Sequence, residues 1–128
     1  MRLELSRRTD LALRGLRHLA ATGTRVKRSD LAAAVGTTPD FLARVMGPMV
    51  KAGWVASEPG RSGGYELVTA TSRISVLQLI EAIEGTPQDG QCVLGRGRCE
   101  VEGRCMLHDA WSRARDALME ELQGTPVG

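Results

Sequence analysis

Aromatic residues are scarce in this chain of 128 residues: two Trp, one Tyr and one Phe make up 3% of it. Hydrophobic residues still reach 42%, so we expect an aliphatic core. No apolar run reaches the about 18 residues of a membrane-spanning helix, and the N-terminal MRLELSRRTD lacks the apolar block of a signal peptide. These absences predict a cytosolic protein without a membrane partner. The length of the chain predicts one compact domain with an appended element.

Cysteine is almost as rare, yet the three cysteines fall close together at Cys92, Cys99 and Cys105. An odd number of cysteines in a reducing compartment favours metal or redox chemistry over a disulfide framework. Thiolates are soft metal ligands, and the glycines between these cysteines let a loop wrap round a compact centre. The segment therefore predicts a metal site, and the alternative is three unrelated cysteines.

His108 is a candidate fourth ligand, because three residues after Cys105 it would lie on the same helical face. Three thiolates and one imidazole fit a structural zinc site, and thiolates also hold iron-sulfur clusters. The same two residues could form the nucleophile and base of a cysteine enzyme. No third orienting group or oxyanion loop is evident, so we expect no enzymatic activity.

The net charge of +2 hides an asymmetry between the two parts of the chain. Residues 1–75 carry 12 Lys and Arg against 6 Asp and Glu, a net charge of +6, whereas residues 76–128 carry 5 against 9, a net charge of −4. A basic N-terminal module suits a polyanionic partner such as DNA.

The apolar spacing predicts three helices in the basic part, over 6–21, 29–36 and 38–53. Ser29 is expected to cap the second helix, and Pro48 to bend or break the third. Two short helices joined by a tight turn form a helix-turn-helix.

A β-hairpin with a glycine-rich tip is predicted over 54–68, directly after the helix-turn-helix, where it would form a wing. A further helix follows, which starts at a capping box between Ser75 and Gln78 and ends at Gly85. The predicted fold is mainly α with a small β-hairpin.

The last helix, predicted over 106–122, has one narrow apolar stripe. This stripe fits a helix-helix seam. It either packs on the chain's own winged helix or joins two copies, and a two-fold dimer matches two half-sites on DNA. The expected divisions are a winged helix-turn-helix in 1–85, a cysteine loop in 86–105 and a dimerisation helix with a tail in 106–128. The stripe consists of Leu107, Trp111, Ala114, Leu118 and Leu122.

The second helix of a helix-turn-helix enters the major groove, and its N-terminal residues reach base edges. Arg44 is the best candidate for reading a base, because its planar donor fork matches guanine. Thr38 is also expected to cap the helix, and Phe41 to pack in the core. The other candidate DNA contacts are Thr38 and Asp40 in the same helix, Arg61 and Ser62 in the wing, and Arg7, Arg8, Arg25, Lys27, Arg28 and Lys51 at phosphates.

The order of LARVMGPMVKAGWV, GRSGGYELV, ISVLQLIEAIEG and three cysteines resembles the bacterial winged-helix regulators typified by IscR and NsrR. The resemblance covers nearly the whole chain. It implies a dimer joined by the C-terminal helix, with a 2Fe-2S or 4Fe-4S cluster in the preceding loop whose binding or loss alters operator affinity. It also implies that Cys92, Cys99 and Cys105 are the thiolate ligands.

The fourth ligand divides this family, and the chain resembles both branches. Asp10, in Thr9-Asp10-Leu11, is similar to the NsrR pattern, in which the aspartate comes from the partner subunit. His108 is similar to the IscR ligand. A carboxylate is easily displaced and suits a labile, gas-sensing cluster. We therefore favour Asp10 over His108 as the fourth ligand, and a 4Fe-4S cluster over a 2Fe-2S cluster. The alternative for Asp10 is an ion pair with Arg14.

The resulting expectation is a homodimeric transcription regulator that acts as a repressor and binds double-stranded operator DNA. Its cluster would sense nitric oxide, redox state or iron-sulfur status, with no other small-molecule substrate. The alternative is a zinc-stabilised DNA-binding protein without a sensory cluster.

Overall fold

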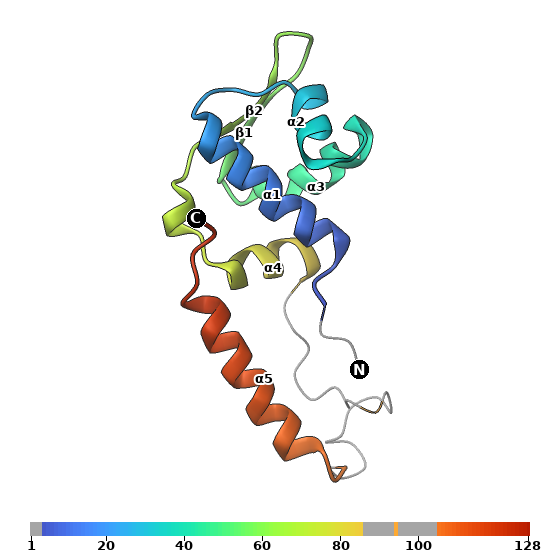
Figure 1. Ribbon diagram of the computed structural model, residues 1–128, viewed down its shortest axis with the longest axis vertical. Coiled ribbons are helices and arrows are strands. Elements are labelled where there is room, and N and C mark those ends of the chain that lie inside the picture. The colour runs from blue at the N-terminus through green and yellow to red at the C-terminus, as the bar shows by residue number, and fades with distance from the viewer. Residues whose placement is uncertain (1–3, 86–93, 95–104) are drawn as a thin grey trace.

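The computed structural model describes residues 4–85, 94 and 105–128. Figure 1 shows a mainly helical body with a projecting β-hairpin and one long helix that leads away from it. None of the helices in the described ranges has the length and apolarity to cross a membrane. The elements are α1 (Arg7–Thr22), α2 (Arg28–Val35), α3 (Pro39–Lys51), β1 (Val55–Glu58), β2 (Gly64–Leu67), the 3-10 turn η1 (Thr71–Arg73), α4 (Val76–Glu84) and α5 (His108–Gln123).

The first helix lies within one residue of its predicted bounds. Ser6 caps it, because its hydroxyl accepts a hydrogen bond from the Thr9 amide at 3.2 Å. Gly23 ends it in the left-handed conformation, with φ 72°. Leucines at helical spacing are buried on one face of α1, including Leu11 and Leu16, while its arginines stay exposed.

The predicted cap of the second helix is wrong. The helix begins at Arg28 with Lys27 at the cap position, so Ser29 lies inside the first turn and caps nothing. The reason is a non-local pairing: Val26 and Tyr65 exchange two backbone hydrogen bonds of 2.9 Å, which hold the chain extended until Lys27. The predicted stop at Gly36 is confirmed, with φ 81°.

The third helix continues through Pro48 to Lys51, so the predicted break does not occur. Proline removes one hydrogen bond from the helix, but Met46 and Met49 on either side of it are fully buried. Packing of this apolar face stabilises the helix despite the missing bond. The predicted Thr38 cap is confirmed, since its hydroxyl accepts from the Phe41 amide at 3.2 Å.

The two strands form the predicted antiparallel hairpin, with Val55 opposite Leu67 and Glu58 opposite Gly64. Gly64 has φ 149° and lies against the backbone of Val26, where a Cβ would overlap the Val26 carbonyl. Glycine at this position therefore permits the pairing between the hairpin and the α1–α2 loop.

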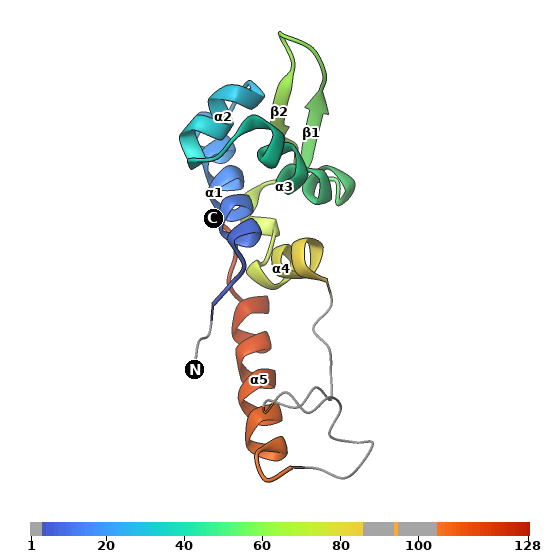
Figure 2. The ribbon, with the colours of Figure 1, turned by 90° about the vertical axis from the view of Figure 1, so that its right-hand side faces the viewer.

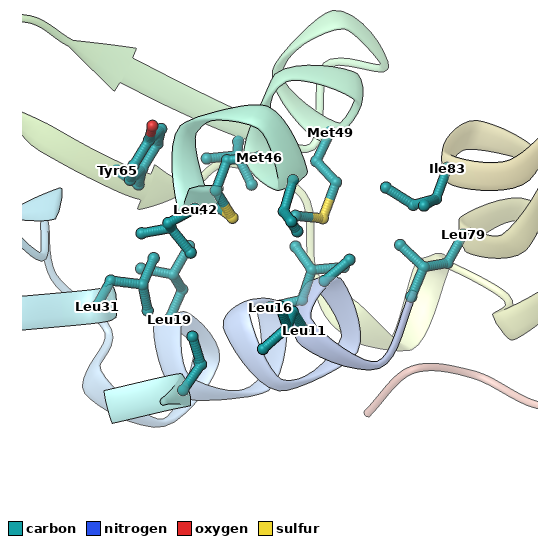
Figure 3. Close-up of a cluster of buried hydrophobic side chains, with 14 of the residues drawn as sticks. Leu11, Leu16, Leu19, Leu31, Leu42, Met46, Met49, Tyr65, Leu79 and Ile83 are labelled. Carbon is teal, nitrogen blue, oxygen red and sulfur yellow. The ribbon is translucent and has the colours of Figure 1, made fainter. Parts of the chain in front are cut away.

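The predicted capping box at α4 is confirmed, with reciprocal bonds of 3.0 and 2.9 Å between Ser75 and Gln78. Leucines and methionines of α1, α3 and α4 meet in one aliphatic core, and Figure 3 shows Met49, Leu79 and Ile83 converging on α1. Beyond α5 the chain returns to this core. There the buried Val127 donates its amide to the Ile74 carbonyl at 2.8 Å.

Candidate DNA interface and metal-binding segment

The solvent face of α3 carries the predicted base-reading residues. Asp40, Arg44 and Lys51 are exposed, whereas the opposite face buries Leu42 and Val45 completely. This alternation leaves one polar stripe along the second helix of the helix-turn-helix. Thr38 precedes the stripe, and its hydroxyl is already engaged in the cap.

The hairpin stands beside α2 and α3, with its tip projecting beyond the body (Figure 2). A groove of about 560 Å³ runs between the hairpin and the N-terminal ends of these helices. Lys27 and Arg28 line it from the start of α2, and Arg61 lines it from the tip of the hairpin. The structure thus brings Arg28 and Arg61 to one concave surface, with Ser62 exposed next to Arg61 in the tip. Converging cations of this kind favour a polyanion.

Tyr65 and Glu58 also line this groove, and the sequence reasoning singled out neither of them. Tyr65 is 6% exposed. Burial raises the pKa of Tyr65, and the positive charge of Arg28 opposes that rise, so the phenol keeps its proton at neutral pH. The sequence feature that points to Tyr65 is its position directly after Gly63 and Gly64, where the chain approaches another segment.

Arg25, a predicted phosphate contact, forms an ion pair with the hairpin. Its Nη2 donates to Glu58 Oε1 at 2.9 Å and lies 3.8 Å from Glu66 Oε2. One guanidinium from the α1–α2 loop therefore reaches both strands of the wing.

The end of the cysteine segment lies at the opposite end of the molecule from the hairpin tip (Figures 1 and 2). Cys105 is half-buried just before α5, and its carbonyl accepts from the amide of His108, the first residue of that helix, at 3.1 Å. Cys92 and Cys99 lie outside the described residues. The ranges 4–85 and 105–128 contain no group of three His, Cys, Asp or Glu side chains arranged to hold a metal.

Asp10 lies in the first turn of α1, where its carboxylate pairs with Arg14 at 3.1 Å. This ion pair is the expected alternative to a metal-binding role for Asp10. Both views show the start of α1 well apart from the start of α5. The structure therefore brings His108 near Cys105 but not Asp10 of the same chain.

The neighbour of Asp10 ties α1 to the end of α4. Thr9 is fully buried, and its Oγ1 donates to Glu84 Oε2 at 2.6 Å. Glu84 is the last residue of α4 and is separated from the cysteine segment only by Gly85. A carboxylate at the N-terminus of α1 is also favoured by the helix dipole.

The apolar stripe of α5 is largely uncovered within one chain. The helix has no buried residue, Leu118 on the stripe is 47% exposed, and Leu107 at the N-cap is 39% exposed. Trp111 and Leu122 are half-buried. Packing on the chain's own winged helix therefore covers little of the surface of this stripe.

Comparison with known proteins agrees with this architecture. The family model of Rrf2, described as an iron-dependent transcriptional regulator, matches residues 5–127. An HTH-type transcriptional regulator of Mycobacterium tuberculosis is 33% identical over 128 residues, covering 98% of this chain and 79% of that protein. IscR of Vibrio vulnificus is 28% identical over 103 residues, covering 80% of this chain and 61% of IscR.

Among solved structures, CymR, the global cysteine regulator of Bacillus subtilis, superposes with a TM-score of 0.75 at 25% identity, over 98% of this chain and 94% of CymR. The polar stripe of α3 and the basic groove beneath the wing are thus set in a fold that transcriptional regulators share, and these proteins are not enzymes. The chain belongs to the Rrf2 family of winged-helix, DNA-binding transcriptional regulators.

Proposed function

We propose that the protein is a homodimeric repressor whose affinity for operator DNA is controlled by an iron-sulfur cluster. The observation that carries this proposal is the position of the three cysteines. They occupy the one segment that connects α4 of the winged helix to the exposed α5. A ligand bound there acts on both the DNA-binding body and the helix that would join two copies.

The donor set fits a cluster. Cys92, Cys99 and Cys105 provide three thiolates, which iron-sulfur clusters require, and His108 or Asp10 provides a fourth donor. When bound, the cluster would supply reactivity toward nitric oxide or oxidants. A 4Fe-4S form ranks ahead of 2Fe-2S, and the relationship to IscR supports either.

DNA contacts are proposed for the stripe on α3 and for the groove. Arg44 would read guanine with its bidentate donor fork, next to Thr38 and Asp40 at the start of the helix. Arg61 and Ser62 would enter the minor groove with the wing. Arg28 and Lys51 would neutralise phosphates.

Transmission from the cysteine segment would run through α4. Leu79 and Ile83 bury α4 against the core that also holds α3, and Glu84 fastens its end to α1 through Thr9. A change in the conformation of residues 86–105 would therefore act on Glu84 first. We infer the division into a winged helix in 1–85, a cluster loop in 86–105 and a dimerisation helix and tail in 106–128.

Separate Cys→Ala changes at Cys92, Cys99 and Cys105 test the cluster. Each should abolish the visible absorption of the anaerobically purified protein, because the segment has no spare thiolate, while the circular dichroism of the helices is unchanged. Full iron and sulfide in any one variant would refute the ligand assignment. A colourless wild type with stoichiometric zinc would establish the zinc-stabilised alternative.

The fourth ligand is tested by comparing Asp10→Ala with His108→Ala. Asp10 lies apart from the start of α5 in its own chain, so its ligation would have to come from the partner subunit. A mixed dimer of Asp10→Ala with Cys99→Ala then keeps one intact site. If its iron content equals that of the two damaged homodimers, Asp10 is not the ligand.

A further inference from the structure

Arg25 forms an ion pair with Glu58, a residue that lines the groove that we propose binds DNA. Their side chains are 40% and 56% exposed, and pairs this exposed contribute little to folding stability. Glu58 also lines the groove beside Lys27, Arg28 and Arg61. A carboxylate in that position opposes the attraction that its neighbours exert on phosphates.

The geometry also shows what Glu58 does to Arg25. The 2.9 Å hydrogen bond holds the guanidinium on the hairpin, and Glu66 on the other strand is farther away, at 3.8 Å. Without Glu58, the half-exposed Arg25 would be an additional cation beside the groove. Non-specific DNA binding depends on the number of phosphates that cations neutralise, whereas operator binding also depends on base contacts.

We propose that Glu58 is a specificity-determining residue: it retains Arg25 on the wing and thereby limits affinity for DNA of any sequence. This inference rests on the proposed DNA-binding function. Arg25 is then a positioning residue of the hairpin in the wild-type protein and contacts no phosphate. The retention of Arg25 on the wing and the repulsion between Glu58 and phosphates both raise the ratio of operator binding to non-specific binding.

The test is a salt titration of binding to random-sequence duplex DNA. Glu58→Ala should bind severalfold more tightly, and its logarithmic salt dependence should be steeper by about 0.9, the value for one more phosphate contact. Glu66→Ala is the matched control, because it removes the same charge from the neighbouring strand but leaves the shorter bond intact. Its salt slope should equal that of the wild type.

The double variant Arg25→Ala/Glu58→Ala separates release of Arg25 from loss of repulsion, and its salt slope should return to the wild-type value. The proposal is overturned if Glu58→Ala leaves the slope unchanged, if the double variant keeps the steeper slope, or if Arg25→Ala alone lowers the slope. Wild-type binding that does not weaken with salt would instead overturn the DNA-binding function itself. Thermal unfolding of all variants confirms that they remain folded.

Discussion

Two glycines in the hairpin region have positive φ, but they differ in what surrounds them. Gly60 (φ 95°) has no heavy atom of the described residues within 4 Å of a Cβ position, whereas a Cβ on Gly64 (φ 149°) would overlap the Val26 carbonyl. Position 64 therefore requires glycine because the Val26 backbone leaves no room for a side chain. Position 60 requires it only because of its positive φ.

We therefore expect Gly64→Ala to destabilise the protein more than Gly60→Ala. Backbone strain alone accounts for about 1–3 kcal/mol at either position. Gly64→Ala should in addition lose the two hydrogen bonds between Val26 and Tyr65, which hydrogen exchange of those two amides detects. Equal losses of unfolding free energy, with both amides still protected, would show that the pairing tolerates a side chain.

Thr9 links α1 to α4 through a hydrogen bond to a carboxylate, so Thr9→Val should lower the free energy of unfolding by about 1.5 kcal/mol in urea titrations. Thr22→Val in the same helix is the control. Its hydroxyl bonds only the His18 carbonyl at an exposed position, so its loss should be small. A loss no larger for Thr9 than for Thr22 would mean that the Glu84 bond contributes nothing.

Residue-level prediction worked where the cause is local. The Thr38 cap and the Ser75–Gln78 capping box both depend on residues three positions apart. It failed at Ser29 because Val26 pairs with a strand far along the sequence. The roles of Glu58 and Tyr65 were missed for the same reason, since the groove exists only once the hairpin is folded.

At the scale of elements, local rules and packing disagree in α3. Proline inside a helix predicts a break, and the buried methionines around Pro48 prevent it. The helical spacing of the apolar residues predicted α3 better than the proline did, because that spacing reflects the packing that stabilises the helix. The helices, the hairpin and their order were therefore predictable, and only their ends shifted.

The C-terminal tail is an element that the periodicity did not predict. Val127 is 5% exposed and its amide donates to the Ile74 carbonyl, so the chain beyond α5 is anchored to the winged helix. Val127→Ala should lower the free energy of unfolding by about 1.5 kcal/mol, measured by thermal or urea unfolding. Val68→Ala, at a side chain that is 58% exposed, should change it much less. Similar losses in both variants would contradict the anchoring.

The hairpin that lines the basic groove and the helix α5 that carries the exposed apolar stripe project from opposite ends of the molecule (Figure 1). The sequence identified the stripe of α5 but not what covers it, because an apolar stripe fits any complementary surface. Within the described chain α5 stays largely uncovered, which supports a second copy as its partner. A two-fold dimer would place two α3 helices on successive half-sites.

Leu118→Glu should therefore dissociate the dimer, because it places a charge in the apolar seam. Arg113→Glu introduces the same carboxylate at an exposed position outside the stripe and should leave the dimer intact. Sedimentation velocity of the two variants at equal concentration measures the difference. A Leu118→Glu protein that sediments as the wild-type dimer would exclude α5 as the seam.

Control of DNA binding by the cysteine segment is tested most directly by one anaerobic titration. The affinity of the brown, cluster-loaded protein for its operator duplex is measured before and after stoichiometric nitric oxide, with the visible spectrum recorded on the same sample. We predict that loss of the cluster absorption and a change in operator affinity occur together, and that Cys99→Ala shows neither. An operator affinity that stays constant while the cluster is destroyed would contradict the proposed control.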